Sequence, residues 1–326
     1  MVVWGHADRR MNQVFYAENL EFLGSIIYSF HIALFFIISG ALFRGGLKGR
    51  DLPAIFSRTV KSILVPFFAL SIVFVPLKLL TLIGSISVTS ILEMFLGIFF
   101  FQSSDWAPSG VLWFLFVLFC GTMFTAILVK RLGLSLVQVL WIAIAIKLAA
   151  PLVDDIHFFA AGKFARNFVF FVFGACFAEV VKDNRVNTRN FVVMSGYIIA
   201  FVPFFLASDI YKPFFQLITG IVGSLAVLKL CAIIARFKSP IGDLLRYCGR
   251  NSMSIFVFHM PSFIFILLAI TKLGLKSSYL GFGLFVLLGC LIPLFIEIVL
   301  KKIPIIYPLL LGRAPEQRLI KAPQEE

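Results

Sequence analysis

Residues 22–43 read FLGSIIYSFHIALFFIISGALF and contain no aspartate, glutamate, lysine or arginine. As an α-helix that rises 1.5 Å per residue, this stretch would be about 33 Å long, enough to cross a hydrocarbon core of about 30 Å. It therefore predicts a transmembrane helix, and this helix carries a histidine, His31, near its middle.

Further stretches of the chain are also long and apolar enough to cross a bilayer: residues 60–83, 111–129, 132–150, 164–181, 191–207, 213–235, 252–272 and 280–300. Residues 91–101 are apolar but too short, so we expect them to be interfacial or re-entrant. The composition agrees, because 60% of the 326 residues are hydrophobic and only 14% are charged. Soluble domains are about half apolar and about a quarter charged. The sequence thus predicts an all-α, polytopic integral membrane protein with nine full spans. We expect a membrane domain over residues 1–311 and a short cytoplasmic tail over residues 312–326.

The basic residues in the loops indicate the orientation of these spans. The positive-inside rule places most of them on one side, predicted to be cytoplasmic together with both chain ends: Arg44, Lys48, Arg50, Arg58, Lys61, Lys130, Arg131, Lys182, Arg185, Arg189, Arg236, Lys238, Arg246, Arg250, Lys301, Lys302, Arg313, Arg318 and Lys321. The other side receives fewer: Arg9, Arg10, Lys163, Arg166, Lys212, Lys272 and Lys276. The net charge of +13 therefore reflects membrane topology, and we expect no binding to nucleic acid.

Several classes of chemistry have no support in the sequence. It contains no GxGxxG, Walker A, HExxH or GxSxG pattern, and no cluster of histidines and cysteines that would predict a metal site. The five cysteines show no CxxC spacing, and most of them lie within apolar runs. We therefore interpret them as small core residues.

Ionisable residues at membrane depth are candidates for chemistry, because placing them in a bilayer is costly. Lys78, Lys147, Glu179, Lys229 and Glu297 lie near span ends, where snorkelling of the side chain to the interface explains them. The histidines differ, because an imidazole titrates near neutral pH and can act as a general base.

Distinctive phrases surround the histidines. They are the opening Val2-Val3-Trp4-Gly5-His6, the FHIALFFIISG run from Phe30 to Gly40, the GVLWFL run that begins at Gly110 and contains Trp113, and the RNSMSIFVFHMP run from Arg250 to Pro261. In this order they resemble the membrane-bound acyltransferase 3 family, which includes bacterial surface-polysaccharide O-acetyltransferases. The FHIALFFIISG phrase is most similar to the fucose O-acetylase-like branch. The family has ten spans, so the resemblance implies that residues before the first full span are the remnant of a first helix. The N-terminus is then truncated relative to the family.

The resemblance implies roles for particular residues. His6 matches the family's catalytic histidine, which an arginine precedes by about ten residues, a position upstream of Met1 here. Arg58 and Lys61 match an Arg-x-x-Arg motif, with lysine in the second position. At i and i+3 of a helix their cations would share one face, where they could bind the phosphates of acetyl-CoA, the implied acyl donor. The alternatives are an interfacial histidine for His6 and a plain topology signal for the basic pair.

Other candidates rest on weaker signals. His31 could orient the acceptor or His6, or could be a hydrogen-bonded core residue. Trp113 could contact substrate, although an aromatic residue at a span start is also typical of packing or anchoring. Asp105 and Trp106, in the outward loop, are residue types that hydrogen-bond and stack on sugars.

The sequence and the resemblance together predict an enzyme of the bacterial inner membrane. It would transfer an acetyl group from acetyl-CoA to a sugar hydroxyl of a surface polysaccharide or lipid-linked glycan, without a metal. Two alternatives remain: a transporter or flippase of glycan precursors, and a degenerate relative that lacks the first helix. The sequence does not indicate an oligomeric state.

Overall fold

The computed structural model describes residues 3, 6, 18–81, 86–100, 102, 105, 107–153, 155–179, 196, 212–235, 239–272 and 278–313. This part of the chain is 86% helical and contains no strand. The all-α prediction is therefore confirmed.

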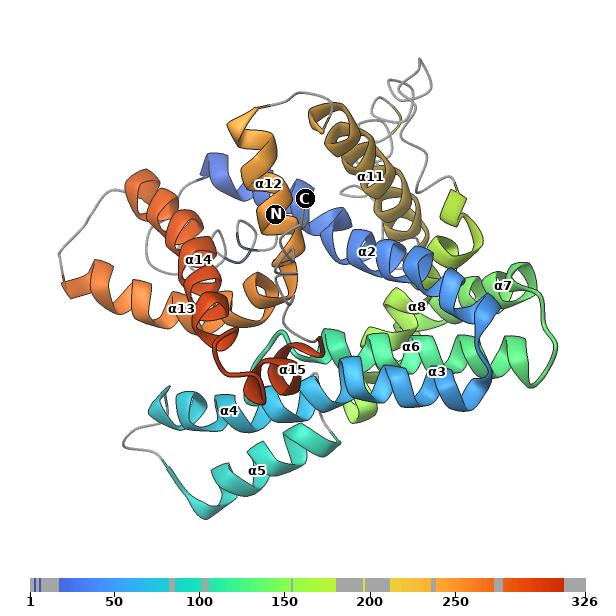
Figure 1. The fold of residues 1–326 in the computed structure, drawn as a ribbon, viewed down its shortest axis with the longest axis horizontal. Helices are drawn as coiled ribbons and strands as arrows, with labels where there is room; N and C mark the ends of the chain where they lie inside the picture. The colour runs from blue at the N-terminus through green and yellow to red at the C-terminus, as the bar shows by residue number, and fades with distance from the viewer. Residues whose placement is uncertain are drawn as a thin grey trace, which may run out of the picture.

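Figure 1 shows the arrangement of the helices. Their bounds are α2 Glu18–Gly49, α3 Leu52–Thr59, α4 Val65–Thr81, α5 Val88–Phe99, α6 Trp113–Lys130, α7 Leu136–Leu148, α8 Ala161–Cys176, α11 Lys212–Ile234, α12 Pro240–Arg250, α13 Ser252–Lys272, α14 Ser278–Leu300 and α15 Ile306–Leu311. A π-helical segment, Val60–Leu64, joins α3 to α4, and short 3-10 turns occupy Ala150–Leu152 and Phe158–Ala160.

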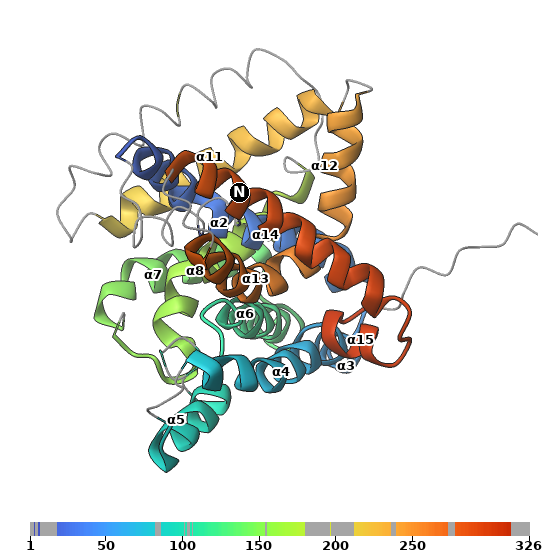
Figure 2. The same ribbon diagram turned by 90° about the vertical axis from the view of Figure 1, so that its left-hand side faces the viewer.

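Within the described ranges, seven helices are long and apolar enough to cross a membrane, and they coincide with seven of the nine predicted spans. The span predicted at 132–150 is the shorter helix α7, which ends at Leu148 and is followed by a 3-10 turn that contains Pro151. Proline lacks the backbone N–H that would continue the α-helical hydrogen bonds. The span predicted at 191–207 lies outside the described residues except for residue 196. Of the segment predicted at 91–101, residues 91–99 fall in α5, a 12-residue helix that projects at the edge of the bundle (Figure 2).

Helices α2 and α8 pack closely against each other. Helix α2 packs along α8 and α11. A Cβ atom on Gly40 of α2 would collide with the carbonyl oxygen of Phe171 in α8, so only glycine permits this approach. Small residues serve the same purpose in membrane helix pairs generally. The glycine that ends the FHIALFFIISG run is therefore explained by packing.

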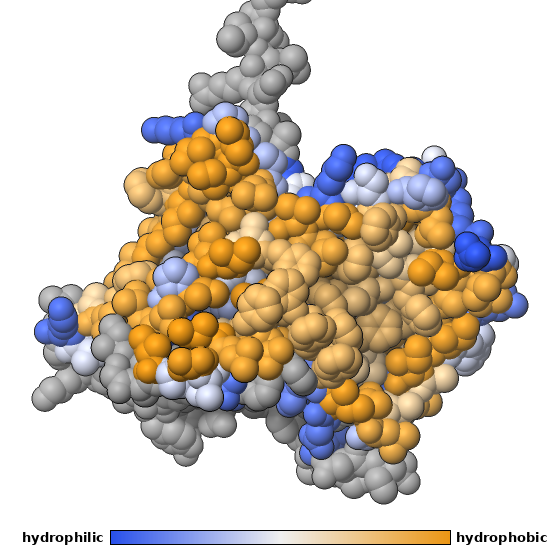
Figure 3. Space-filling view, turned by 90° about the horizontal axis from the view of Figure 1, so that it is seen from below, coloured by the Kyte–Doolittle hydropathy of each residue, from blue (hydrophilic) through white to orange (hydrophobic). Residues whose placement is uncertain are grey.

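The surface agrees with a lipid environment. Figure 3 shows a broad apolar face with hydrophilic residues gathered towards its edges. Large apolar side chains are widely exposed, and they include Ile72, Val88, Trp141, Leu152 and Phe295. A soluble monomer rarely exposes so extensive an apolar surface. The protein is a multi-pass membrane protein.

Two of the residues predicted to snorkel do not. Lys147 is 2% exposed and donates to Oε1 of Gln216 at 3.1 Å, because α11 covers it. Glu297 is 1% exposed and accepts from Lys301, Tyr307 and Arg313 at 3.1, 2.9 and 2.7 Å. The prediction was wrong for both, because distance from a helix end does not reveal whether a neighbouring element covers that end.

The orientation of the bundle can be tested with reporters. We expect a reporter that is active only outside the cytoplasm to give signal when fused after residue 105 and none when fused after residue 133, between α6 and α7. The physical reason is the retention of the Lys130–Arg131 loop on the inner side. Both fusion points are exposed. The opposite pattern would place the arginine-rich loops outside and would contradict the prediction.

Candidate functional site

A cavity of about 270 Å³ is lined by both histidines that were predicted as site residues, His6 and His31. Helix α2 contributes four of its lining residues, and the rest come from the turn before α6, from the start of α6, from α8, from α13 and from His6. The lining comprises His6, Tyr28, His31, Ile32, Phe35, Gly110, Val111, Trp113, Phe114, Lys163 and Phe256. The structure thus brings together His6, His31 and Trp113, which lie far apart in the sequence.

Tyr28 links the two histidines. Its hydroxyl lies 3.3 Å from Nδ1 of His6, and its ring meets the His31 ring edge-on at a centroid distance of 4.8 Å. His31 is 3% exposed, and its Nδ1 lies 3.0 Å from the carbonyl oxygen of Ile27. A carbonyl can only accept, so Nδ1 of His31 carries the proton when the ring is neutral. The ring orientation of His31 is therefore fixed by its own helix.

A cation lines the same cavity. The ammonium group of Lys163 lies 5.3 Å from the centre of the Trp113 ring, a cation–π geometry. Both side chains are half-buried. Trp113 therefore contributes to the cavity wall and also holds a positive charge beside it.

Asp105 does not reach this cavity. Its side chain is exposed, and its backbone carbonyl accepts a hydrogen bond of 3.0 Å from Lys78. Lys78 lines a smaller hollow of about 170 Å³ that adjoins the histidine cavity at Gly110. Trp106 lies outside the described residues.

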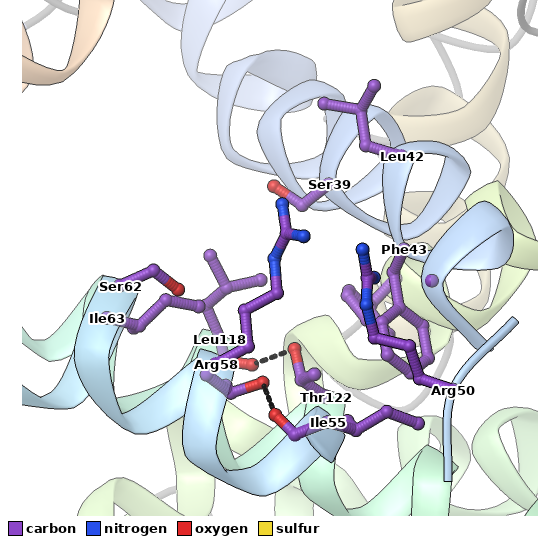
Figure 4. Close-up of a pocket in the computed structure, with 13 residues that line it drawn as sticks. Ser39, Leu42, Phe43, Arg50, Ile55, Arg58, Ser62, Ile63, Leu118 and Thr122 are labelled. Atoms are coloured by element: carbon purple, nitrogen blue, oxygen red, sulfur yellow. Dashed lines mark hydrogen bonds between the residues drawn. The ribbon is translucent and has the colours of Figure 1, made fainter. Parts of the chain in front are cut away.

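A second cavity, of about 330 Å³, is lined by Arg50 and Arg58 (Figure 4). Both guanidinium groups point into the space between α2 and α3, and that of Arg58 points towards Ser39. Asp51 begins α3 by accepting from the backbone N–H of Ala54 at 3.0 Å, which fixes the turn between the two arginines. The other lining residues are Leu42, Phe43, Gly46, Ile55, Thr59, Ser62, Ile63, Leu118, Thr122 and Phe171.

Lys61 is not part of this lining. It is exposed and lies in the π-helical segment, where the i to i+5 hydrogen bonds widen the turn. The prediction that Arg58 and Lys61 share one face assumed a regular α-helix. In the structure Arg58 lines the cavity together with Arg50.

The two cavities are stacked along α2 and α6. On α2, Phe35 lines the histidine cavity and Ser39 lines the arginine cavity. On α6, Phe114 and Leu118 do the same. Each pair is four residues apart, a rise of about 6 Å. The ring of Phe114 lies 5.9 Å from that of Phe35 and 5.2 Å from that of Phe256, so a layer of aromatic side chains borders the histidine cavity on this side.

The fold and these cavities define an integral membrane protein with an internal polar site between its helices. Residues 1–301 match the family described as an acyltransferase domain, and the chain belongs to this acyltransferase 3 family. It is therefore a membrane acyltransferase by family. No curated protein and no solved structure matches the chain. The fucose O-acetylase-like branch and the truncated first helix stay predictions.

Sequence reasoning missed Tyr28, Arg50 and Lys163 as site residues. Tyr28 carried a usable signal, because it lies three residues before His31 and so shares its helical face. Arg50 and Lys163 were interpreted only as loop charges. Their positions depend on how α2, α3, α6 and α8 pack, which no local pattern reveals.

Proposed function

We propose that this protein is an O-acyltransferase of the bacterial inner membrane that moves an acetyl group from acetyl-CoA to a hydroxyl of a surface polysaccharide or lipid-linked glycan. The observation that carries the proposal is the stacking of an arginine-lined cavity and a histidine-lined cavity along the same two helices. One anionic and one neutral hydroxylic substrate would need such a pair of sites. A transporter has no chemical need for the histidine cluster.

Acetyl-CoA would bind at the arginine cavity. Its phosphates suit guanidinium groups, which can form bidentate charge-assisted hydrogen bonds. Arg50 and Arg58 lie on the side that the basic loops predict to be cytoplasmic, where the donor is available. The acetyl thioester would then extend past the aromatic layer towards His6.

The glycan hydroxyl would react in the histidine cavity. Nδ1 of His6, beside the Tyr28 hydroxyl, would take the proton as the hydroxyl oxygen attacks the thioester carbonyl carbon. The carbon–sulfur bond then breaks, and His6 donates the proton it took from the hydroxyl to the thiolate of coenzyme A. The ammonium group of Lys163 would stabilise the negative charge on the carbonyl oxygen in the transition state. The products are an acetyl ester and free coenzyme A.

Changes to the arginine cavity test the donor site. We expect Arg58→Ala and Arg50→Ala each to weaken acetyl-CoA affinity by about tenfold to a hundredfold, because each removes a charge-assisted contact of about 1.5–3 kcal/mol. Lys61→Ala should have a smaller effect, because its side chain lies outside the cavity. The measurement is binding of radiolabelled acetyl-CoA to the protein in nanodiscs.

Lys48→Ala is the matched control, since Lys48 is an exposed cation near Arg50 that does not line the cavity. Unchanged acetyl-CoA binding in both arginine variants would mean that these residues only set topology. The same preparation tests the function directly when label from acetyl-CoA is followed into lipid-linked glycan. No transfer to any glycan fraction by an acetyl-CoA-binding protein would count against the proposed acceptor.

A further inference from the structure

His259 of α13 is a fully buried histidine with an unused hydrogen-bond acceptor. Its exposed fraction is 0%. Its Nδ1 lies 3.0 Å from the carbonyl oxygen of Ile255 and 2.7 Å from that of Phe256. Because carbonyl oxygens only accept, Nδ1 carries the proton and Nε2 of the neutral ring keeps a lone pair. Among the described residues, Nε2 has no hydrogen-bond partner.

Among the described residues, the rings that surround this acceptor are apolar except on one side. The rings in contact with His259 are Phe256 and Phe263, with centroids 6.4 and 5.5 Å away, and His6 at 5.2 Å. Helix α14 contributes Phe285, which packs on Phe263. The titratable groups on the other side of His6 line the histidine cavity: Tyr28, His31 and Lys163. His6 is therefore the polar ring that lies against His259.

We propose that His259 is a positioning residue that accepts a hydrogen bond from Nε2–H of His6. This role rests on the proposed function, since it sets which nitrogen of His6 is the base. With its proton on Nε2, neutral His6 keeps its lone pair on Nδ1, beside Tyr28. Catalytic hydrogen bonds are often long without substrate and shorten in the reacting complex.

The same contact supports the proton transfer. When Nδ1 takes the proton of the acceptor hydroxyl, His6 becomes a cation with two N–H groups. A hydrogen bond from Nε2–H to a neutral acceptor stabilises this charged form and makes His6 a stronger base. His259 stays neutral, and no bond to it forms or breaks.

The test compares His259→Phe, which removes the acceptor, with His259→Gln, whose amide oxygen can still accept at the position of Nε2. We expect His259→Phe to lower kcat by about tenfold to a hundredfold, because a hydrogen bond to the charged form of His6 is lost, with little change in KM for acetyl-CoA. The pH–rate profile should also move. His6 works unprotonated, and its protonated form loses stabilisation in this variant, so the rise in rate should shift to lower pH by about one unit. His259→Gln should recover part of both effects.

A second measurement does not depend on activity. The chain has four histidines, so 15N-histidine NMR of the protein in detergent can be assigned by single replacements. We expect the Nε2–H tautomer at His6 in the unchanged protein and its loss in His259→Phe. His157→Phe is the control, because His157 is exposed and does not line the cavity. An unchanged His6 tautomer and pH profile in His259→Phe would overturn this role. Failure of the unchanged protein to transfer acetyl groups would instead count against the proposed function, while the tautomer would still report on the contact.

Discussion

Replacing His6 with alanine should lower acetyl transfer by about 10²–10⁴-fold, the usual contribution of a general base, while the protein is still inserted into the membrane. His6 lines the histidine cavity, and the hydroxyl of Tyr28 lies 3.3 Å from its Nδ1. The measurement is acetylation of glycan in cells, with membrane abundance quantified in parallel.

Binding of acetyl-CoA is the informative control for this variant. The arginine cavity is separate from His6, so donor affinity should stay unchanged in His6→Ala. His157→Ala tests the loss of a histidine at an exposed position and should retain full transfer. Full acetylation by His6→Ala would contradict the histidine mechanism and favour the transport or degenerate alternatives.

The fold was predictable where a single property decides it. A long apolar run favours a bilayer, and within the bilayer a helix pairs all of its backbone N–H and C=O groups. Residues 22–43 and 252–272 are runs of this kind, and both correspond to helices. Helix α7 shows the limit of this argument. Residues 132–150 have the hydropathy of a span, but the Ser135 capping box and Pro151 confine the helix to 13 residues.

The site was predictable only in part, because its residues meet through packing. The phrases around His6, His31 and Trp113 identified three members of one cavity. The pairing of Arg50 with Arg58 depends on the sharp turn at Asp51, and the displacement of Lys61 depends on a π-helical segment. Asp51 and Pro53 mark where a helix begins but not how α3 then packs beside α2, and the π-helical segment leaves no regular pattern in the sequence. Asp105 was chosen by residue type alone, and its side chain lies outside the cavity.

The buried carboxylate of Glu297 connects three parts of the chain near the arginine cavity. It accepts from Tyr307 of α15 and from Arg313, whose other guanidinium nitrogen donates to the carbonyl oxygen of Arg250 at 2.7 Å. Gly312 lies between Tyr307 and Arg313 in the chain and has a φ of 66°. It packs so closely on the backbone of Ser62 that a Cβ atom would collide with it. Ser62 lines the arginine cavity. The carboxylate therefore helps to hold the backbone beside the predicted donor site.

Glu297→Ala should lower the free energy of unfolding by about 3 kcal/mol, because it leaves the buried hydroxyl of Tyr307 without its acceptor and breaks two ionic contacts. The cations of Lys301 and Arg313 are 36% and 39% exposed, so water can solvate them and limit the loss. The measurement is unfolding in mixed micelles with increasing denaturing detergent. Glu93→Ala, at an exposed glutamate of α5, is the control, and an equal effect of both would contradict the role of Glu297.

Tyr307 should make the stability of the protein sensitive to alkaline pH. Burial, followed by its hydrogen bond to Glu297, raises the pKa of Tyr307 from 10.0 to about 12. The folded protein therefore holds this proton more tightly than the unfolded chain does. The resulting stabilisation is fully present below about pH 10 and is lost as the pH rises through about 12.

Because lysines and cysteines also titrate in this range, the readout is the difference between the unchanged protein and Tyr307→Phe. That variant lacks the titrating hydroxyl, so the two unfolding free energies should converge between about pH 10 and 12. A difference that stays constant across this range would show that the hydrogen bond from Tyr307 to Glu297 does not stabilise the fold.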